Sequence, residues 1–231
     1  MADICAQVRG EMEHLVTEDD LPVDNILSEK QQRLLTEPLY GAWTGPEEYT
    51  PGHRPFLALA NVGLFYALRE PPLVPDVMLA LDVVGVGADL SQKPNRSYFV
   101  WEQGHPPLVA IEIVSNREGG EDREKFQKYV TAGVGYYVIF DPWRQLSERV
   151  LRIYRLAGRS YVEQVGGQFP DAGLGVTLWQ GDYEGEYQQW LRWVDHTGKL
   201  IPTGAERAEK AEQRAEQLAA QLRAMGIEPS I

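Results

Sequence analysis

Three short, strongly apolar runs in the middle of the chain constrain the fold more than any other feature. They cover residues 73–83, 106–115 and 133–142, and their length and composition are typical of buried β-strands. Between the second and third runs, residues 119–132 have helical character and are bounded by glycines. A strand, a helix and another strand form a crossover unit. The sequence therefore predicts an α/β fold with a mixed sheet of about five or six strands flanked by helices.

Helix signals precede these strands. Residues 28–36 predict a short helix with Ser28 as N-cap and Gln31 at the capping-box position. Pro38 follows closely, and we expect it to help end that helix.

Strand signals continue downstream. Residues 150–165 alternate in polarity around Ala157–Gly158, as a β-hairpin does. Residues 173–179 predict one more strand, and residues 182–195 form a mixed aromatic and acidic segment.

The composition is that of an ordinary globular protein, with 43% apolar and 24% charged residues. No run of about 18 apolar residues could span a bilayer, and the N-terminal segment lacks the layout of a signal peptide. The single cysteine, Cys5, cannot form an internal disulfide. These features predict a cytoplasmic protein with no membrane partner.

The net charge of −12 argues against a protein that simply coats nucleic acid, which needs clustered Lys and Arg. The acidity is unevenly distributed, however. Residues 1–50 hold eleven acids and three bases, whereas residues 51–142 hold eleven acids and eight bases. The segment with the candidate site is therefore nearly balanced.

The tail from Ala205 onward is rich in Ala, Glu, Gln and Arg. Its apolar residues follow the 3-4-3-4-3 spacing of a coiled-coil seam. A solvated terminal helix and a helix that forms a homodimer both fit this pattern. We expect an N-terminal acidic segment (1–25), a main domain (26–200) and a helical tail (201–231). The seam residues are Ala208, Ala211, Ala215, Leu218, Leu222 and Met225.

Several enzyme classes lack their motifs here. The chain has no GxxxxGK[ST], HExxH or GxSxG motif, and its four histidines do not have metal-ligand spacing. The segment 85–90 begins like a dinucleotide-binding fingerprint but has Leu90 at the third glycine position. P-loop nucleotide, zinc-protease and α/β-hydrolase chemistry are therefore not indicated.

Two carboxylates interrupt the apolar runs and need an explanation, because an unpaired buried carboxylate is costly. Asp76 lies in the first run and Glu112 in the second. On adjacent strands they would repel each other unless a cation lay between them, and oxygen ligands of this kind suit Mg²⁺ or Mn²⁺. The alternative is that Asp76 caps a turn after Pro75 and Glu112 pairs with a surface base.

The same residues carry a resemblance to a known family. Pro75–Asp76, Glu112 in the sequence IEIVS, Lys125, Tyr129 and the sequence GVGYYVIFDP together resemble the Uma-two family. That family belongs to the PD-(D/E)XK nuclease superfamily, and its members are described as restriction endonucleases. The resemblance runs from about Ile26 to Leu200.

The sequence departs from the superfamily pattern at one position. The (D/E)XK half-motif requires a lysine two residues after Glu112, but residue 114 is Val. Lys125 resembles the lysine that this family carries on the following helix instead, and Lys128, one turn away, is the alternative. Lys125 could also form an i,i+4 pair with Glu121 on an exposed helix face.

The resemblance implies a metal-dependent endonuclease that hydrolyses DNA phosphodiester bonds. Asp76, Glu112 and the backbone carbonyl of Ile113 would bind Mg²⁺ or Mn²⁺, and Lys125 would act on the attacking water or the transition state. Two alternatives are a catalytically inactive, nuclease-fold interaction protein that dimerises through its tail, and a metal hydrolase of small phosphoesters.

Other residues have both a functional and a structural interpretation. Glu29 and Gln32 lie on the first helix, where the superfamily often places an additional carboxylate near the metal, but cap and surface roles fit equally well. Ser115 and Asn116 either hydrogen-bond substrate or form the turn after the strand. For the aromatic candidates we expect packing in preference to base stacking: these are Tyr129, Tyr136, Tyr137, Trp101 and Trp143.

Overall fold

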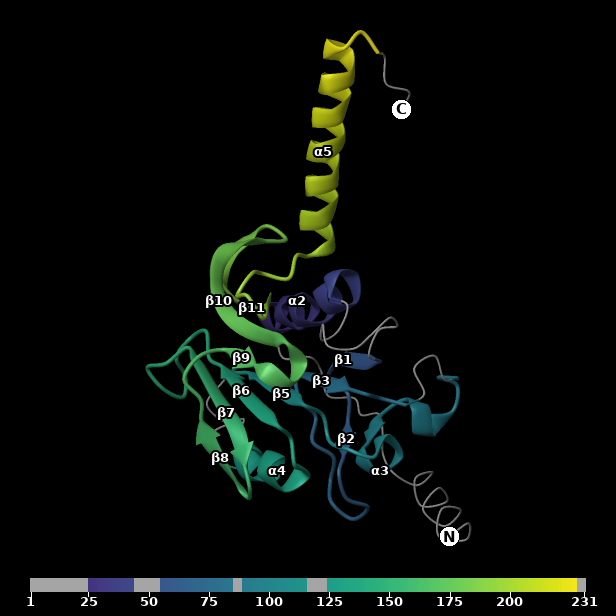
Figure 1. Cartoon of the computed structure of the whole chain (residues 1–231). Coiled ribbons are helices and arrows are strands. Elements are labelled where there is room, and N and C mark those ends of the chain that lie inside the picture. The colour runs from purple at the N-terminus through teal and green to yellow at the C-terminus, as the bar shows by residue number, and fades with distance from the viewer. Residues whose placement is uncertain (1–24, 44–54, 85–88, 116–123, 228–231) are drawn as a thin grey trace.

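The computed structural model of the protein describes residues 25–43, 55–84, 89–115 and 124–227 (Figure 1). Its centre is a six-stranded sheet with the strand order β1-β3-β5-β6-β7-β8. Neighbouring strands are antiparallel except β5 and β6, which are parallel. The mixed α/β fold predicted from the sequence is therefore confirmed. The strands are β1 (Phe56–Ala60), β3 (Val77–Leu81), β5 (Val109–Ile113), β6 (Tyr136–Phe140), β7 (Leu151–Ala157) and β8 (Ser160–Glu163).

The crossover unit lies where the sequence predicts it. Helix α4 (Glu124–Ala132) connects the parallel strands β5 and β6. The helix ends at Gly133, whose φ of 79° is in the left-handed region that favours glycine. The amide groups of Gly133 and Val134 both donate to the carbonyl oxygen of Tyr129, which closes the last turn.

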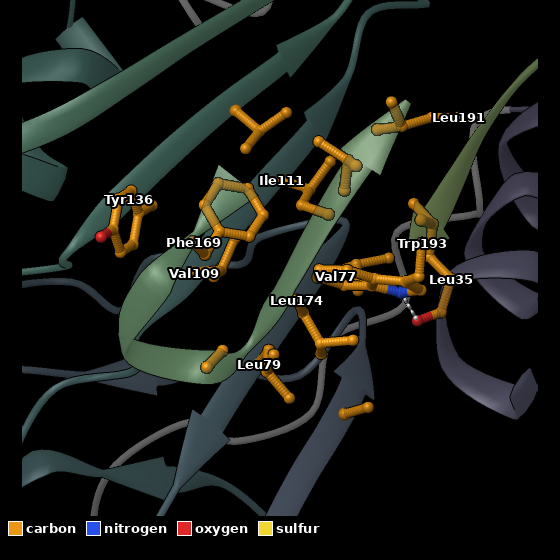
Figure 2. Close-up of a cluster of buried hydrophobic side chains, with 14 of the residues drawn as sticks. Leu35, Val77, Leu79, Val109, Ile111, Tyr136, Phe169, Leu174, Leu191 and Trp193 are labelled. Atoms are coloured by element: carbon orange, nitrogen blue, oxygen red, sulfur yellow. Dashed lines mark hydrogen bonds between the residues drawn. The ribbon is translucent and has the colours of Figure 1, made fainter. Parts of the chain in front are cut away.

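One face of the central sheet packs against helix α2 (Ile26–Ala42) and a second sheet of order β11-β10-β9. The second sheet consists of β9 (Gln168–Phe169), β10 (Leu174–Tyr183) and β11 (Glu186–Asp195). Figure 2 shows this core, where the indole Nε1 of Trp193 donates to the carbonyl oxygen of Leu35 at 2.7 Å. This hydrogen bond ties β11 to α2 inside the apolar layer.

The opposite face of the sheet is covered by α4 and by a parallel strand pair, β2 (Leu64–Phe65) and β4 (Tyr98–Phe99). Helix α3 (Val100–Gln103) follows β4, and two 3₁₀ turns, η1 (Lys93–Asn95) and η2 (Pro170–Ala172), lie in connections. Met78, Ala110 and Ile139 project from the sheet into this second cluster. Residue 112 shares this face with residue 110, because side chains alternate along a strand.

Helix α2 is longer than predicted, and its start was assigned wrongly. Asn25, not Ser28, is the N-cap, and its side chain accepts a hydrogen bond from the amide of Ser28 at 2.9 Å. The helix continues through Pro38 to Ala42. Proline removes one helical hydrogen bond, but Pro38 and its neighbour Leu39 are buried here. Burial of this apolar turn offsets the lost bond.

Strands β10 and β11 form a long hairpin that the sequence indicated only in part. The strand predicted at residues 173–179 is present as β10, but the segment at 182–195 also becomes a strand, β11. Residues 186–188 of β11 are exposed and residues 190–194 are buried. The hairpin turn contains Glu184 and Gly185, with φ of 52° and 80°. Because β11 begins with exposed residues, its sequence lacks the apolar pattern that predicts a strand.

Helix α5 (Gly204–Ala224) confirms the predicted helical tail and leaves the body as a long arm (Figure 1). Its start is held by a capping box between Thr203 and Glu206. The buried Arg192 also donates to both carboxylate oxygens of Glu206 at 2.7 Å. None of the residues of α5 is buried. No helix in the described part of the chain is long and apolar enough to cross a membrane.

Candidate active site

Asp76 and Glu112 lie on adjacent strands of the central sheet. Strands β3 and β5 are antiparallel, with Val77 paired to Ile111. Continuing this register by one pair places Asp76, directly before β3, opposite Glu112. Residues directly opposite in an antiparallel pair project from the same face, with Cβ atoms about 5 Å apart. The fold therefore brings these two carboxylates together.

The Glu112 carboxylate is buried and hydrogen-bonded at both oxygens. The hydroxyl of Tyr129 donates to Oε1 at 2.6 Å, and Nζ of Lys125 donates to Oε2 at 3.0 Å. Burial, followed by the charge of Asp76, raises the pKa of Glu112 to about 8, although Lys125 and Tyr129 act in the opposite direction. A carboxylate with this pKa is marked by its environment as a candidate functional group.

The Asp76 carboxylate is half-buried and is oriented by two donors. Its Oδ2 accepts the backbone N–H of Ile113 at 2.6 Å, and its Oδ1 accepts Nε2 of Gln32 at 3.3 Å. A residue's N–H and C=O point to the same side of a strand. The carbonyl of Ile113 therefore faces Asp76 as well, where it could complete a set of oxygen ligands.

Asn61 belongs to this arrangement and was missed in the sequence. Its side chain forms a pair with that of Gln32, with N–O distances of 3.0 and 3.3 Å. The backbone N–H of Asn61 donates to the backbone carbonyl oxygen of Asp76 at 3.3 Å. Its φ of 53° is in the left-handed region, which Asn tolerates better than most residues. An Asn two residues before Gly63, after an apolar run, was the only available signal.

The two candidate lysines have different partners. Lys125 contacts Glu112, whereas Nζ of Lys128 lies 2.5 Å from Glu124 on the same helix. The alternative partner of Lys125, Glu121, lies outside the described residues. Of the two lysines, Lys125 is therefore the one placed at the carboxylates.

The aromatic candidates divide into one site residue and four packing or surface residues. Tyr129 contacts Glu112 directly. The hydroxyl of Tyr136 donates to Asp171 in η2, and Tyr137 stacks on Tyr154 and Tyr161 in the aromatic cluster beside α4. Trp101 packs against Phe99, and Trp143 is exposed. The expectation of packing is therefore confirmed for the three tyrosines and Trp101, although the hydroxyl of Tyr129 also contacts Glu112, and it is wrong for Trp143.

The polar candidates also divide. Gln32 contacts Asp76, but Glu29 pairs with Arg33 on the exposed side of α2. Ser115 follows β5 and is partly buried. Asn116 lies outside the described residues. Gln32 is thus the polar candidate on α2 that contacts the carboxylate pair.

A buried guanidinium lies on the same face of the sheet. Glu112 pairs with Ile139 on β6, and Ile139 pairs with Arg152 on β7, so Arg152 projects two strands away from Glu112. Arg152 is buried, and its Nε and Nη2 have no hydrogen-bond partner among the residues that the structure describes. Unmet buried donors are costly, and nothing in the sequence indicated this feature.

The donor set fits a hard divalent cation. Among the described residues, no cluster of three or more Asp, Glu, His or Cys side chains could hold a metal. Two opposed carboxylates and a backbone carbonyl remain, all with oxygen donors. Mg²⁺ is usually held by one or two carboxylates, with water and substrate oxygens completing the shell. A cation at this position would also relieve the repulsion between Asp76 and Glu112.

Comparison with known families agrees with the resemblance seen in the sequence. The family model of Uma2, described as "Putative restriction endonuclease", matches residues 22–178. This is the Uma-two family, and the match covers more than half of the chain. A comparison with curated proteins gave no match. The chain therefore belongs to the Uma2 family.

Proposed function

We propose that this protein is a metal-dependent endonuclease that hydrolyses phosphodiester bonds in DNA. One observation carries the proposal: the opposed carboxylates of Asp76 and Glu112, with Lys125 3.0 Å from the second of them. Two carboxylates with an adjacent ammonium group are the parts needed to bind a cation and to stabilise a phosphorane-like transition state. DNA as the substrate rests on family membership.

Asp76, Glu112 and the carbonyl of Ile113 would hold Mg²⁺ or Mn²⁺. When bound, such an ion polarises a phosphoryl oxygen and lowers the pKa of a coordinated water. Glu112 must lose its proton to act as a ligand, and its raised pKa couples metal binding to proton release. Metal affinity should therefore increase with pH up to about 8.

Lys125 has a role distinct from that of the carboxylates. Its ammonium group now donates to Oε2 of Glu112. In the loaded site this group can orient the attacking water or stabilise negative charge on the phosphoryl oxygens. Its side chain is about one third exposed, so it can move toward a substrate.

Three neighbouring residues position the carboxylates. The Tyr129 hydroxyl fixes Oε1 of Glu112, while Gln32 and Asn61 together hold Asp76. Ligands held by such hydrogen bonds lose little freedom when a cation binds.

The acidic chain implies weak DNA binding at physiological salt, so activity is best sought at low ionic strength. We expect the protein to act in the cytoplasm.

The test is nicking of supercoiled DNA in the presence of Mg²⁺, Mn²⁺ or Ca²⁺. Asp76→Ala and Glu112→Ala should each abolish cleavage and weaken metal binding, measured by calorimetry. Lys125→Ala should abolish cleavage but keep metal binding, because the lysine is not a ligand. Ca²⁺ should bind without supporting turnover, since it tolerates looser geometry and activates water poorly. Lys128→Ala is the matched control and should cleave normally.

A specific outcome of the same experiment would contradict the nuclease proposal. If wild-type protein cleaves no form of DNA with either metal, and Asp76→Ala binds Mg²⁺ as well as wild type, the nuclease proposal fails. A second candidate, a catalytically inactive nuclease fold that serves as an interaction protein, would then hold. One observation favours it: Val114 is fully buried in an apolar cluster where the superfamily has its lysine.

A further inference from the structure

Helix α5 is hydrogen-bonded to the body at one end and uncovered along the rest of its length. Glu206 in its first turn is held by the buried Arg192, and Arg207 donates to the carbonyl oxygen of Gly41 at the end of α2. Beyond this base the helix extends away from the body (Figure 1). Leu218 and Met225 are 52% and 73% exposed. Most helical stability in proteins comes from the packing of an apolar face, so a further contact along this uncovered length would stabilise the helix.

Six apolar residues of α5 and its C-cap form a continuous seam; five of them are exposed and Leu222 is partly buried. Ala208, Ala215 and Leu222 occupy heptad positions a, while Ala211, Leu218 and Met225 occupy positions d. All six lie at the 3-4 spacing that makes one stripe on an α-helix. The three alanines are exposed, and Ala211 borders an open groove of about 780 Å³ beside Tyr40 and Trp43. The body therefore does not cover the seam.

Charges beside the seam distinguish the two possible orientations of a second helix. Arg207 and Arg214 are at positions g, and Glu212 is at a position e. In a parallel, in-register pair, a residue at g faces the residue at e five positions later in the partner. This aligns Arg207 with Glu212 of the other copy, twice by symmetry. An antiparallel pair instead brings g residues opposite g residues and e residues opposite e residues, so it cannot align Arg207 with Glu212.

We propose that two copies of this chain associate through α5 as a parallel, in-register, two-stranded coiled coil. The occupant of the seam is a second copy of the same chain, because the flanking charges complement themselves in this arrangement. Only one guanidinium nitrogen of Arg207 is used by Gly41, so the others can reach Glu212 of the partner copy. Both bodies then lie at the same end of the coil. The proposal does not depend on the nuclease activity.

Sedimentation equilibrium of the full-length protein tests the association. Leu218→Glu combined with Leu222→Glu removes four leucines from the dimer seam and should weaken dimerisation at least on the order of 100-fold. Gln217→Glu combined with Ala220→Glu is the matched control, because it adds the same charge on the outer positions c and f. This control should dimerise like wild type. Glutamate is a good helix former, and circular dichroism will verify that the helix content of both variants is unchanged.

Cysteine cross-linking tests the orientation. In a Cys5→Ser background, Ala208→Cys should form an intermolecular disulfide under mild oxidation. A parallel in-register coil places the two residue-208 Cα atoms within the roughly 7 Å that a disulfide allows. A fully overlapped antiparallel pair places them about 25 Å apart, at a rise of 1.5 Å per residue.

A charge swap tests the register. Arg207→Glu or Glu212→Arg alone should weaken the dimer several-fold, and the double variant should restore it. A monomeric wild type at its highest soluble concentration, or a dimer that survives the two leucine substitutions, overturns the proposal. A dimer without cross-linking at residue 208, or without rescue in the double charge swap, overturns the parallel register.

Discussion

Replacing Glu112 by glutamine should stabilise the metal-free protein at neutral pH. The folded-state pKa of Glu112 is about 8, against a reference value of 4.5. A raised pKa means that this group contributes its full stability below about pH 4.5 and loses it as the pH rises through about 8. At pH 7 the folded protein still holds a proton on Glu112 that the unfolded chain has released. Glutamine keeps the shape of the neutral acid and removes this titration.

The size of the effect follows from the same two pKa values. Each pH unit between 4.5 and 8 removes about 1.4 kcal/mol from the free energy of unfolding. At pH 7 the accumulated loss is about 3 kcal/mol. The Glu112→Gln variant should recover about this amount, which corresponds to a rise in Tm of roughly 6–12 °C for a domain of this size. Near pH 4.5 the variant should gain almost nothing.

Urea unfolding in the presence of EDTA, from about pH 5 to about pH 9, measures this difference directly. Glu148→Gln changes an exposed glutamate and is the control for loss of one negative charge. Added Mg²⁺ should stabilise wild type increasingly toward pH 8, because the ion competes with the proton, and should not stabilise Glu112→Gln. If the glutamine variant is less stable than wild type at pH 7, or both show the same pH dependence, the assignment of a buried, charge-coupled carboxylate is refuted.

Three further substitutions probe the neighbourhood of Glu112. Lys125→Ala should raise the pKa of Glu112 further, because the ammonium group of Lys125 lowers it. In the cleavage assay this variant should reduce turnover at least about 100-fold, whereas Lys128→Ala should leave turnover within about twofold. Tyr129→Phe removes the hydrogen bond to Oε1, and urea unfolding should show a loss of about 1–3 kcal/mol. Arg152→Met removes a buried guanidinium group that has two unmet hydrogen-bond donors, so the free energy of unfolding should stay equal or rise by about 1 kcal/mol or more. A clear loss of stability would show that other interactions compensate for burial of the Arg152 charge.

The fold could be predicted where hydrophobicity alone decides it. The three apolar runs became β3, β5 and β6, because each is buried on both faces of the sheet. The prediction failed where tertiary contacts override local signals. Pro38 does not end α2, since the turn that contains it is buried. Strand β11 begins with exposed polar residues, and only its pairing with β10 makes it a strand.

The candidate site, like the fold, could be predicted from the sequence only in part. Asp76 and Glu112 stood out because a charge inside an apolar run is unusual, and the role expected of Lys125 came from the resemblance to the family. Asn61 and the hydroxyl of Tyr129 could not be identified from the sequence. The first depends on a left-handed backbone conformation, and the second on a contact between α4 and β5. Both arise only after long-range packing.

The energetics of Glu112 bear on the choice between an enzyme and an inactive scaffold. Burial and the neighbouring charge of Asp76 raise the pKa of Glu112, so this carboxylate lowers stability as the pH rises toward and above neutrality. A scaffold gains nothing from an ionisable group at residue 112, since a neutral side chain there would avoid this loss of stability. Yet the chain also holds Asp76 in place with Gln32 and Asn61. A carboxylate with a raised pKa is expected where the charged form of that carboxylate is needed in the presence of a cation. The metal-free cost of Glu112 is therefore the physical argument that favours catalysis.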